Sequence, residues 1–279
     1  MPELAQEIPQ RQQWIYRHSV VVRVTHWINV LCLVVLLMSG LMIFNAHSQL
    51  DWGEASDFER PFVEIKAEYG KDGQPAKGVT RVMGYEFDTT GLLGLSGSGD
   101  LREARAFPRW ITIPDDHDLA TARRWHFFFA WLFVINGLIY LVSGFVKRHF
   151  SRDLVPSRLQ LRHIGRSIVE HLKLRFPKGD EARQYNVLQK LSYLVVVFVL
   201  LPVMVLAGLA MAPALDAYSI TALFGGRQSA RTIHFLVADL LVLFVLVHVV
   251  MVLISGVWNN LRSMLTGRFS IEPGEKPHE

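Results

Sequence analysis

The chain has 279 residues, of which 51% are hydrophobic, and its mean hydropathy is +0.24. This composition is too apolar for a typical soluble domain and indicates a small polytopic membrane protein. The formal net charge is only +4, so the distribution of charge along the chain is more informative than its total. The single cysteine, Cys32, excludes a disulfide framework, covalent attachment of haem c, and a cysteine cluster for iron–sulfur or zinc.

Four segments are long and apolar enough to cross a bilayer, which takes about 20 residues each. They cover residues 24–44, 125–146, 191–212 and 233–257. The residues before the first segment are polar, so we expect no removable signal peptide. Pro202 lies inside the third segment, where a membrane helix tolerates a kink if its neighbours satisfy the freed carbonyl. We therefore predict an all-α, integral membrane four-helix bundle that forms a single domain over residues 1–279.

Basic residues near the span ends predict the orientation of the bundle. The 147–190 segment holds eleven Lys and Arg residues against four acidic ones, and the N-terminal tail adds Arg11, Arg17 and Arg23. The positive-inside rule makes both segments cytoplasmic. We expect a multi-pass protein of the bacterial inner membrane with both termini in the cytoplasm, and the 47–122 loop in the periplasm.

Two histidines, His234 and His248, lie fourteen residues apart in the fourth span. On an α-helix this separation is about 21 Å of rise and about 40° short of four turns, so both imidazoles lie on nearly the same face. Each is near a different leaflet. Histidines inside a membrane helix are costly to bury and are functional candidates.

The first two spans supply partners at matching depths. His26 begins the first span on the cytoplasmic side, as does His248, and His126 begins the second span on the outer side, as does His234. Haem iron takes two axial imidazoles from opposite faces of the porphyrin. The sequence therefore predicts two bis-histidine haem sites, His26 with His248 and His126 with His234.

Arginines and a glycine accompany these histidines. Arg23, Arg123 and Arg231 each stand three residues before a histidine, in RVTH, RRWH and RTIH. This spacing puts both side chains on one helix face, where a guanidinium can bind a haem propionate. The alternative is that these arginines only mark span ends by snorkelling. Gly40 follows His26 by fourteen residues, which leaves room for a macrocycle at the depth of the outer site.

The motifs together resemble a known family. RVTHW at 23–27, the histidine in the second span, the fourteen-residue histidine spacing in the fourth, and YNVLQK at 185–190 are similar to the prokaryotic cytochrome b561-like di-haem subunits. These serve formate dehydrogenases and nickel–iron hydrogenases. The amino-acid sequence of the second and third spans is most similar to that of thiosulfate reductase cytochrome b subunits.

This resemblance implies specific roles. It implies two haem b groups held by the same two histidine pairs, and electron transfer between quinone and a redox partner. It also implies a quinone site beside the inner haem, formed by Asn186, Gln189 and Lys190. From the residues alone, these three also suit a helix N-terminus with a snorkelling lysine.

The 47–122 loop departs from the family pattern by its length. Its GLLGLSGSGD stretch is not a phosphate loop, because the Lys and Ser/Thr that complete such a loop are missing. A long outer loop is typical of a docking surface or a cap. The resemblance to thiosulfate reductase subunits implies a periplasmic redox subunit of the molybdopterin type as the partner, together with quinone. We also expect contact with lipid but not with nucleic acid.

Two other functions stay open at this stage. One is a stand-alone quinol-dependent cytochrome b that reduces or oxidises a small acceptor. The other is a metal or proton transporter that uses the histidines directly. Transporters more often carry intramembrane carboxylates beside their histidines, and Asp239 is the only acid deep in a span here. The chain shows no site for a terminal substrate, so we expect an electron-transfer subunit.

Overall fold

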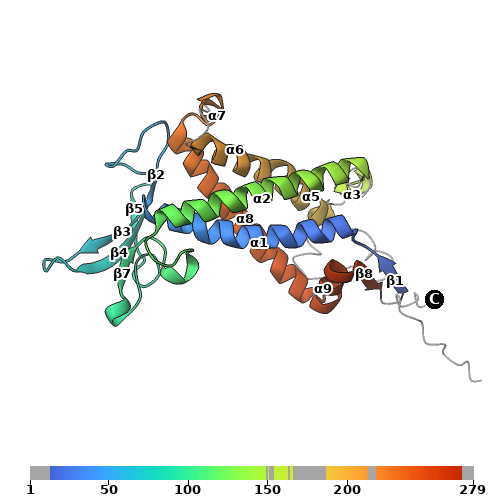
Figure 1. Ribbon diagram of the computed structural model, residues 1–279, viewed down its shortest axis with the longest axis horizontal. Coiled ribbons are helices and arrows are strands. Elements are labelled where there is room, and N and C mark those ends of the chain that lie inside the picture. Colours follow the sequence, from blue (N-terminus) through green and yellow to red (C-terminus); the bar gives the residue numbers. More distant parts are fainter. Residues whose placement is uncertain are drawn as a thin grey trace, which may run out of the picture. The chain divides into compact units, whose positions relative to one another are not determined.

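The computed structural model describes residues 13–148, 150, 154–162, 164–165, 187–212 and 218–271 (Figure 1). Within them, four long helical segments are apolar enough to cross a membrane. They are α1 (Val20–Asn45), α2 (Leu119–Val146), the composite segment Val187–Met211, and α8 (Arg227–Ile254). Between 11% and 28% of their most apolar stretches is buried within the protein. Helices this apolar and this exposed need lipid around them, so the chain is a multi-pass membrane protein.

The third span is not one regular helix. It consists of α5 (Val187–Val195), a π-helical segment η5 (Val196–Leu200), and α6 (Leu201–Met211). Pro202 stands at the start of α6, where its missing N–H removes a bond to the preceding turn. A π-helical turn next to a proline is a common way for a helix to absorb this loss.

The chain divides into two compact units. The first unit is Met1–His26, Ile139–Phe198 and Phe244–Glu279, and the second unit is Trp27–Leu138 and Val199–Leu243. All four spans pass from one unit into the other along the chain, so each unit contains part of every span.

Two apolar clusters form the core of the second unit. In one, Cys32 and Val35 of α1 pack against Phe129 and Phe133 of α2, and all four are less than 9% exposed. The spacings of three and four residues place each pair on a single helix face. In the other cluster, Phe44 at the end of α1 packs with three residues of the following loop, namely Leu50, Ile65 and Ala106.

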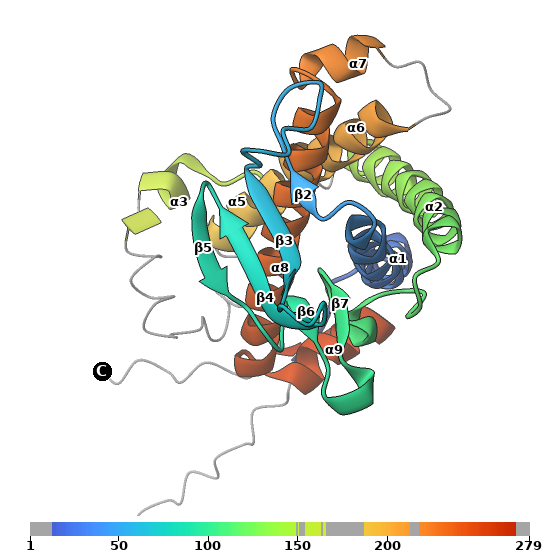
Figure 2. The same cartoon turned by 90° about the vertical axis from the view of Figure 1, so that its left-hand side faces the viewer.

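The 47–122 loop contains β-structure, which the all-α prediction missed. A four-stranded antiparallel sheet has the order β2 (Gln49–Leu50), β3 (Val63–Tyr69), β4 (Pro75–Val82), β5 (Tyr85–Asp88) (Figure 2). A second antiparallel pair joins β6 (Gly94–Ser96) to β7 (Glu103–Arg105). The fold is therefore a helical membrane bundle that carries a small β-structure. These strands are short and interspersed with charged residues, so they leave no signal in a hydropathy scan for membrane spans.

The glycine-rich stretch has a structural role in this loop. Gly94 has φ of +76°, and a Cβ there would overlap the carbonyl oxygen of Lys66. Only glycine fits a backbone that combines a left-handed conformation with such a close approach.

Short elements complete the described residues. They are β1 (Gln13–Tyr16), η1 (Gly99–Leu101), η2 (Arg109–Ile111), α3 (Arg158–Arg162), α7 (Tyr218–Leu223), α9 (Val257–Thr266) and β8 (Arg268–Ile271). In the first unit, β1 and β8 pair in antiparallel register from Gln13 opposite Ile271 to Tyr16 opposite Arg268.

Candidate functional site

The first unit brings together the histidines of α1 and α8 that were predicted to pair on the cytoplasmic side. The ring centroids of His26 and His248 are 6.4 Å apart, and the ring planes form an angle of 64°. Phe244, one turn before His248 on α8, stacks on the His248 ring at 5.9 Å and 18°. Tyr193 of α5 meets the edge of Phe244 at 6.4 Å. Aromatic packing therefore restricts the orientation of the His248 ring.

The second unit contains the other predicted pair. His126 of α2 and His234 of α8 have ring centroids 6.3 Å apart and an interplanar angle of 61°. The two units thus repeat the same arrangement, in which α8 supplies one imidazole and a different helix supplies the other.

Both separations fit an iron between two imidazoles. A metal–nitrogen bond of about 2.0 Å adds to a ring radius of about 1.15 Å, which follows from ring bonds of roughly 1.35 Å. Two imidazoles on opposite sides of one iron then have centroids about 6.3 Å apart. The observed 6.3 Å and 6.4 Å match this value. The residues present therefore fit two bis-histidine haem sites.

The imidazole proton of His126 is on Nδ1, the nitrogen that faces Ser39. Ser39 of α1 lies 3.1 Å from His126 Nδ1, and its hydroxyl donates to the Val35 carbonyl at 2.6 Å. Because a hydroxyl has only one proton, Ser39 Oγ must accept a hydrogen bond from His126 Nδ1–H. This tautomer leaves Nε2 with a free lone pair, which is the form that ligates a metal.

His234 is held in the same way by α6. Its Nδ1 lies 3.0 Å from the carbonyl oxygen of Met204, which can only accept. His234 therefore also carries its proton on Nδ1 and keeps Nε2 unprotonated.

A glycine accompanies each of these two rings. A Cβ at Gly40 would lie 3.4 Å from His126 Cε1, and one at Gly208 would lie 3.3 Å from His234 Cε1. A larger side chain at either position would displace the neighbouring imidazole from its orientation. Gly40 thus lies where its spacing from His26 predicted, although its neighbour is the imidazole itself.

Two of the three predicted propionate arginines bond to backbone in this structure. Arg23 Nη1 donates to the carbonyl of Leu265 in α9, and Arg231 Nη2 donates to the carbonyl of His47. Arg23 Nε is buried and has no acceptor among the described residues, so a further anionic acceptor suits it. Arg231 also lies 5.7 Å above the Phe44 ring.

Arg123 and His47 have different surroundings from Arg23 and Arg231. Arg123 is exposed and lies 5.8 Å from the ring of Phe127 one turn later. Partial burial, followed by the charge of Arg231, lowers the pKa of His47. His47 is therefore neutral at neutral pH and adds no charge beside Arg231.

The residues predicted for the quinone site are only partly described. Asn186 lies outside the described residues. Gln189 is on α5, and the neighbouring Lys190 is 6% exposed, with its Nζ 3.3 Å from Gln160 Oε1 of α3. A buried lysine with an amide partner provides hydrogen-bond donors at this end of the span. Asp239, the acid in the fourth span, lies on the exposed side of α8.

Sequence reasoning did not identify Ser39, Met204 or Gly208. Ser39 follows His26 by thirteen residues and precedes Gly40, so its helical phase placed it at the depth of His126. Met204 acts through its backbone, which the identity of a side chain does not reveal.

Comparison with known proteins places the chain in a family. No solved structure gives a significant match. The chain is 29% identical over 235 residues to a putative protein-methionine-sulfoxide reductase subunit, YedZ1, of Azospira oryzae, which covers 84% of this chain and 89% of the relative. The family model described as prokaryotic cytochrome b561 matches residues 17–267. The match spans most of the chain, both histidine pairs included, so the chain belongs to the prokaryotic cytochrome b561 family of membrane proteins that bind b-type haem.

Proposed function

We propose that this chain is a di-haem b-type cytochrome subunit that moves electrons between the quinone pool and a periplasmic redox partner. The observation that carries the proposal is the repeated pairing of imidazoles at 6.3 Å and 6.4 Å, the separation suited to a shared iron. Bound haem would supply one-electron redox chemistry, and the chain would supply ligands, orientation and control of potential.

Each pair has a proposed role. His26 and His248 would ligate the haem on the cytoplasmic side, and His126 and His234 the haem on the periplasmic side. Arg23, Arg123 and Arg231 would neutralise propionates. The unsatisfied Nε of Arg23 supports this for the first unit.

The proposed orientation agrees with the distribution of charge. The first unit has 17 Lys and Arg residues against nine Asp and Glu residues in its sequence. An excess of basic residues marks the cytoplasmic side of a bacterial inner-membrane protein. Both termini would then be cytoplasmic, and the 47–122 loop periplasmic.

A quinone site at the cytoplasmic side would involve Asn186, Gln189 and Lys190. Buried Lys190, with its partner Gln160, offers a donor for a quinone carbonyl at the start of α5. Two electrons and two protons must reach each quinone, so hydrogen-bonding groups near the membrane surface suit this role.

The proposed partner is a periplasmic oxidoreductase of the molybdopterin class, as the resemblance to thiosulfate reductase subunits implies. The relative from Azospira oryzae is named as a subunit of a protein-methionine-sulfoxide reductase, which supports a partner enzyme rather than a chain acting alone. The β-structure of the 47–122 loop offers an ordered surface on which such a partner could dock.

Haem content tests the ligand assignment directly. We expect two protohaems per purified chain by pyridine haemochrome, and one after His248→Ala or after His234→Ala. His117→Ala is the matched control, because His117 is exposed in the loop and paired with Glu103 at 2.9 Å, and it should keep both haems. A well-folded preparation with no haem, or variants that keep two, would rule out the assignment.

A further inference from the structure

Helix α9 is amphipathic, and two large side chains at one edge of its apolar face are exposed. Trp258 is 76% exposed and Leu265 is 58% exposed, and they lie on one face with Arg262 between them, because seven residues make about two turns. The opposite side is polar. Ser263 is 2% exposed, and Asn259, one turn earlier, exchanges two hydrogen bonds of 2.7 Å and 2.9 Å with the backbone of Ser270 in β8.

A helix of a soluble protein usually turns its large apolar side chains to the core. In α9 the described residues leave Trp258 and Leu265 largely uncovered, whereas Val257, Leu261 and Met264 are partly buried. Lipid can cover the two exposed side chains.

The exposed face of α9 continues the lipid-facing surface of a span. Helix α8 ends at Ile254 and α9 begins at Val257, and Gly256 makes the turn between them with φ of +102°. Just before this turn, Leu253 of α8 is 60% exposed. The apolar face of α9 therefore begins where the span reaches the membrane surface, which is the position of an interfacial helix.

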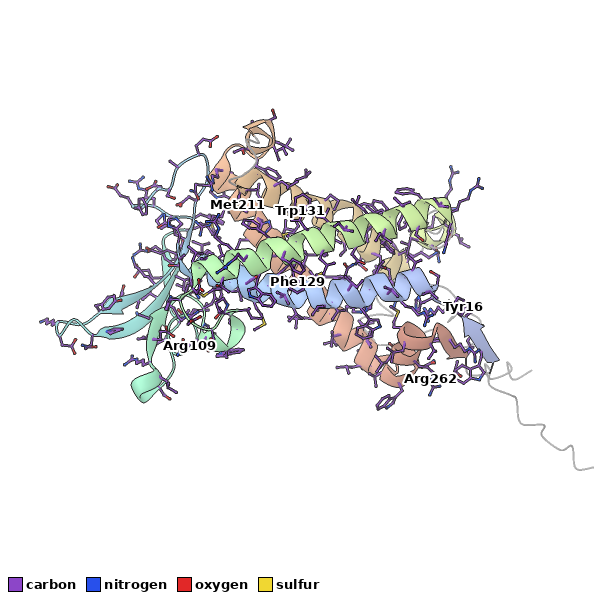
Figure 3. All side chains as sticks on the ribbon, in the orientation of Figure 1. Tyr16, Arg109, Phe129, Trp131, Met211 and Arg262 are labelled. Atoms are coloured by element: carbon purple, nitrogen blue, oxygen red, sulfur yellow. The ribbon has the colours of Figure 1, made fainter. Side chains whose placement is uncertain are left out.

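The β1–β8 ribbon adds aromatic and basic groups to the same surface. Trp14 and Tyr16 of β1 are 49% and 63% exposed, and such residues are enriched where membranes meet water. The Arg262 guanidinium lies 5.2 Å from the Trp14 ring, and Figure 3 shows Arg262 and Tyr16 on these neighbouring elements. Arg268 of β8 is exposed as well.

We propose that α9 and the β1–β8 ribbon form a membrane-surface anchor that binds anionic phospholipid headgroups. Trp258 and Leu265 would enter the boundary between headgroups and acyl chains, and Arg262 and Arg268 would bind the lipid phosphates. The surroundings supply the complementary charge, since the first unit has 17 Lys and Arg residues against nine Asp and Glu residues in its sequence. This inference depends on the membrane spans and not on the haem assignment.

The anchor is connected to the proposed haem ligand His26. Arg23, three residues before His26 on α1, donates from Nη1 to the carbonyl of Leu265 in the last turn of α9. A helix C-terminus favours such a cation. Helix α9 is therefore hydrogen-bonded directly to α1, one turn before His26.

Cysteine alkylation tests whether lipid covers α9. In a Cys32→Ala background, Trp258→Cys is compared with Leu101→Cys in the loop and Leu246→Cys in α8, which are 76%, 75% and 60% exposed in the wild type. The purified chain in nanodiscs, where both membrane faces are accessible, is treated with a maleimide-linked polymer. We expect Trp258→Cys to react about tenfold more slowly than Leu101→Cys, and Leu246→Cys not to react.

Equal rates for Trp258→Cys and Leu101→Cys in nanodiscs would overturn the proposal and leave a cytoplasmic protein as the occupant of this face.

Lipid dependence tests the headgroup contacts. Adding phosphatidylglycerol to phosphatidylcholine nanodiscs should raise the Tm of the wild type by about 4 °C, and the double variant Arg262→Gln with Arg268→Gln should lose this increase. The control pair is Arg60→Gln with Lys71→Gln, which removes the same charge from exposed loop positions and should keep the increase. An equal response from both double variants would contradict a specific headgroup site.

Discussion

Single contacts around the imidazoles of the second unit set their protonation before any ligand binds. His126 donates from Nδ1 to Ser39 and His234 donates from Nδ1 to Met204, at 3.1 Å and 3.0 Å. Ligating histidines usually have such a partner, which orients the ring and raises its basicity. The two acceptors differ in kind, because only the Ser39 hydroxyl can be removed by substitution.

The substitution Ser39→Ala should raise the midpoint potential of one haem without removing it. Loss of the acceptor makes His126 a weaker donor to ferric iron, and a hydrogen bond of about 1 kcal/mol corresponds to roughly 20–60 mV for one electron. The backbone of Leu36 also hydrogen-bonds this ring and should keep it in place. Redox titration followed by optical spectroscopy measures the shift.

Two variants control this experiment. Ser39→Thr keeps a hydroxyl and should restore the potential. Ser192→Ala removes a hydroxyl bonded to Gln189 in its own helix and should leave this potential unchanged. An unchanged potential in Ser39→Ala would mean that the hydroxyl does not act on the haem.

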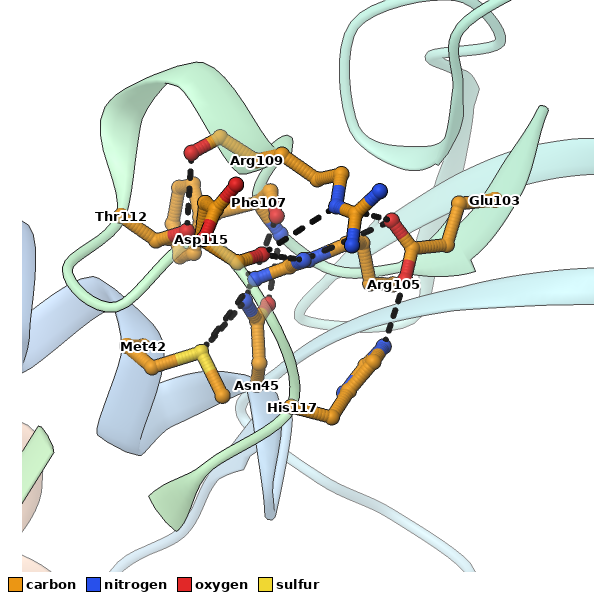
Figure 4. A network of polar contacts seen from close by, with 9 residues as sticks. All are labelled: Met42, Asn45, Glu103, Arg105, Phe107, Arg109, Thr112, Asp115 and His117. Carbon is orange, nitrogen blue, oxygen red and sulfur yellow. Dashed lines mark hydrogen bonds and ion pairs between the residues drawn. The ribbon is translucent and has the colours of Figure 1, made fainter. Parts of the chain in front are cut away.

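At the scale of elements, one buried arginine joins the parts of the loop to α1. The Arg105 side chain has no exposed surface, and it donates to the carbonyl of Asp115 at 2.7 Å and to Thr112 Oγ1 at 3.0 Å (Figure 4). It also lies 3.2 Å from Met42 Sδ of α1 and 3.4 Å from Glu103. The Arg105 guanidinium, from strand β7, thus contacts both the segment after η2 and the end of α1.

Replacing Arg105 with Met should destabilise the loop. The substitution removes the only described side-chain donor to Thr112 Oγ1 and the shorter of two donors to the Asp115 carbonyl, the other being Arg109 Nε at 3.3 Å. We expect a cost of about 2–4 kcal/mol, or about 5–10 °C in Tm. Arg109→Met is the matched control, because Arg109 approaches the same Glu103 at 3.6 Å but its side chain is 52% exposed. It should cost about 0–1 kcal/mol. Equal losses in the two variants would show that burial of Arg105 is not the cause.

The elements differ in how well the sequence predicted them. The spans follow from hydropathy alone, because lipid requires about 20 consecutive apolar residues. The strands of the loop depend on pairing between distant residues, such as Val63 opposite Val82. A hydropathy scan does not detect such pairing, although Asp72-Gly73 between β3 and β4 is a local hairpin signal.

At the scale of the whole molecule, the charges of the two units support one orientation in the membrane. The first unit has 17 basic residues against nine acidic ones, whereas the 47–122 loop of the second unit has eight basic residues against fourteen acidic ones. Because basic residues resist translocation across the inner membrane, we expect the C-terminus in the cytoplasm.

Reporter fusions check this orientation. A fluorescent protein at the C-terminus should fold and fluoresce, since it would stay in the cytoplasm. Alkaline phosphatase inserted at Gly99, in an exposed turn of the loop, should be active in the periplasm. Activity of phosphatase fused to the C-terminus would reverse the proposed orientation, and with it the sides assigned to the two histidine pairs.

The sequence by itself determined the class of this protein, its four candidate spans, and the histidines that come together in pairs. These follow from hydropathy and helical phase, which depend only on residue order along a span. The family membership inferred from those motifs is confirmed by the match over residues 17–267. Helix packing brought Ser39, Met204 and Gly208 to the imidazoles, and strand pairing built the sheet of the loop. Tertiary structure also decided that Trp258 and Leu265 of α9 are exposed, because this depends on which face of α9 bonds to β8 through Asn259.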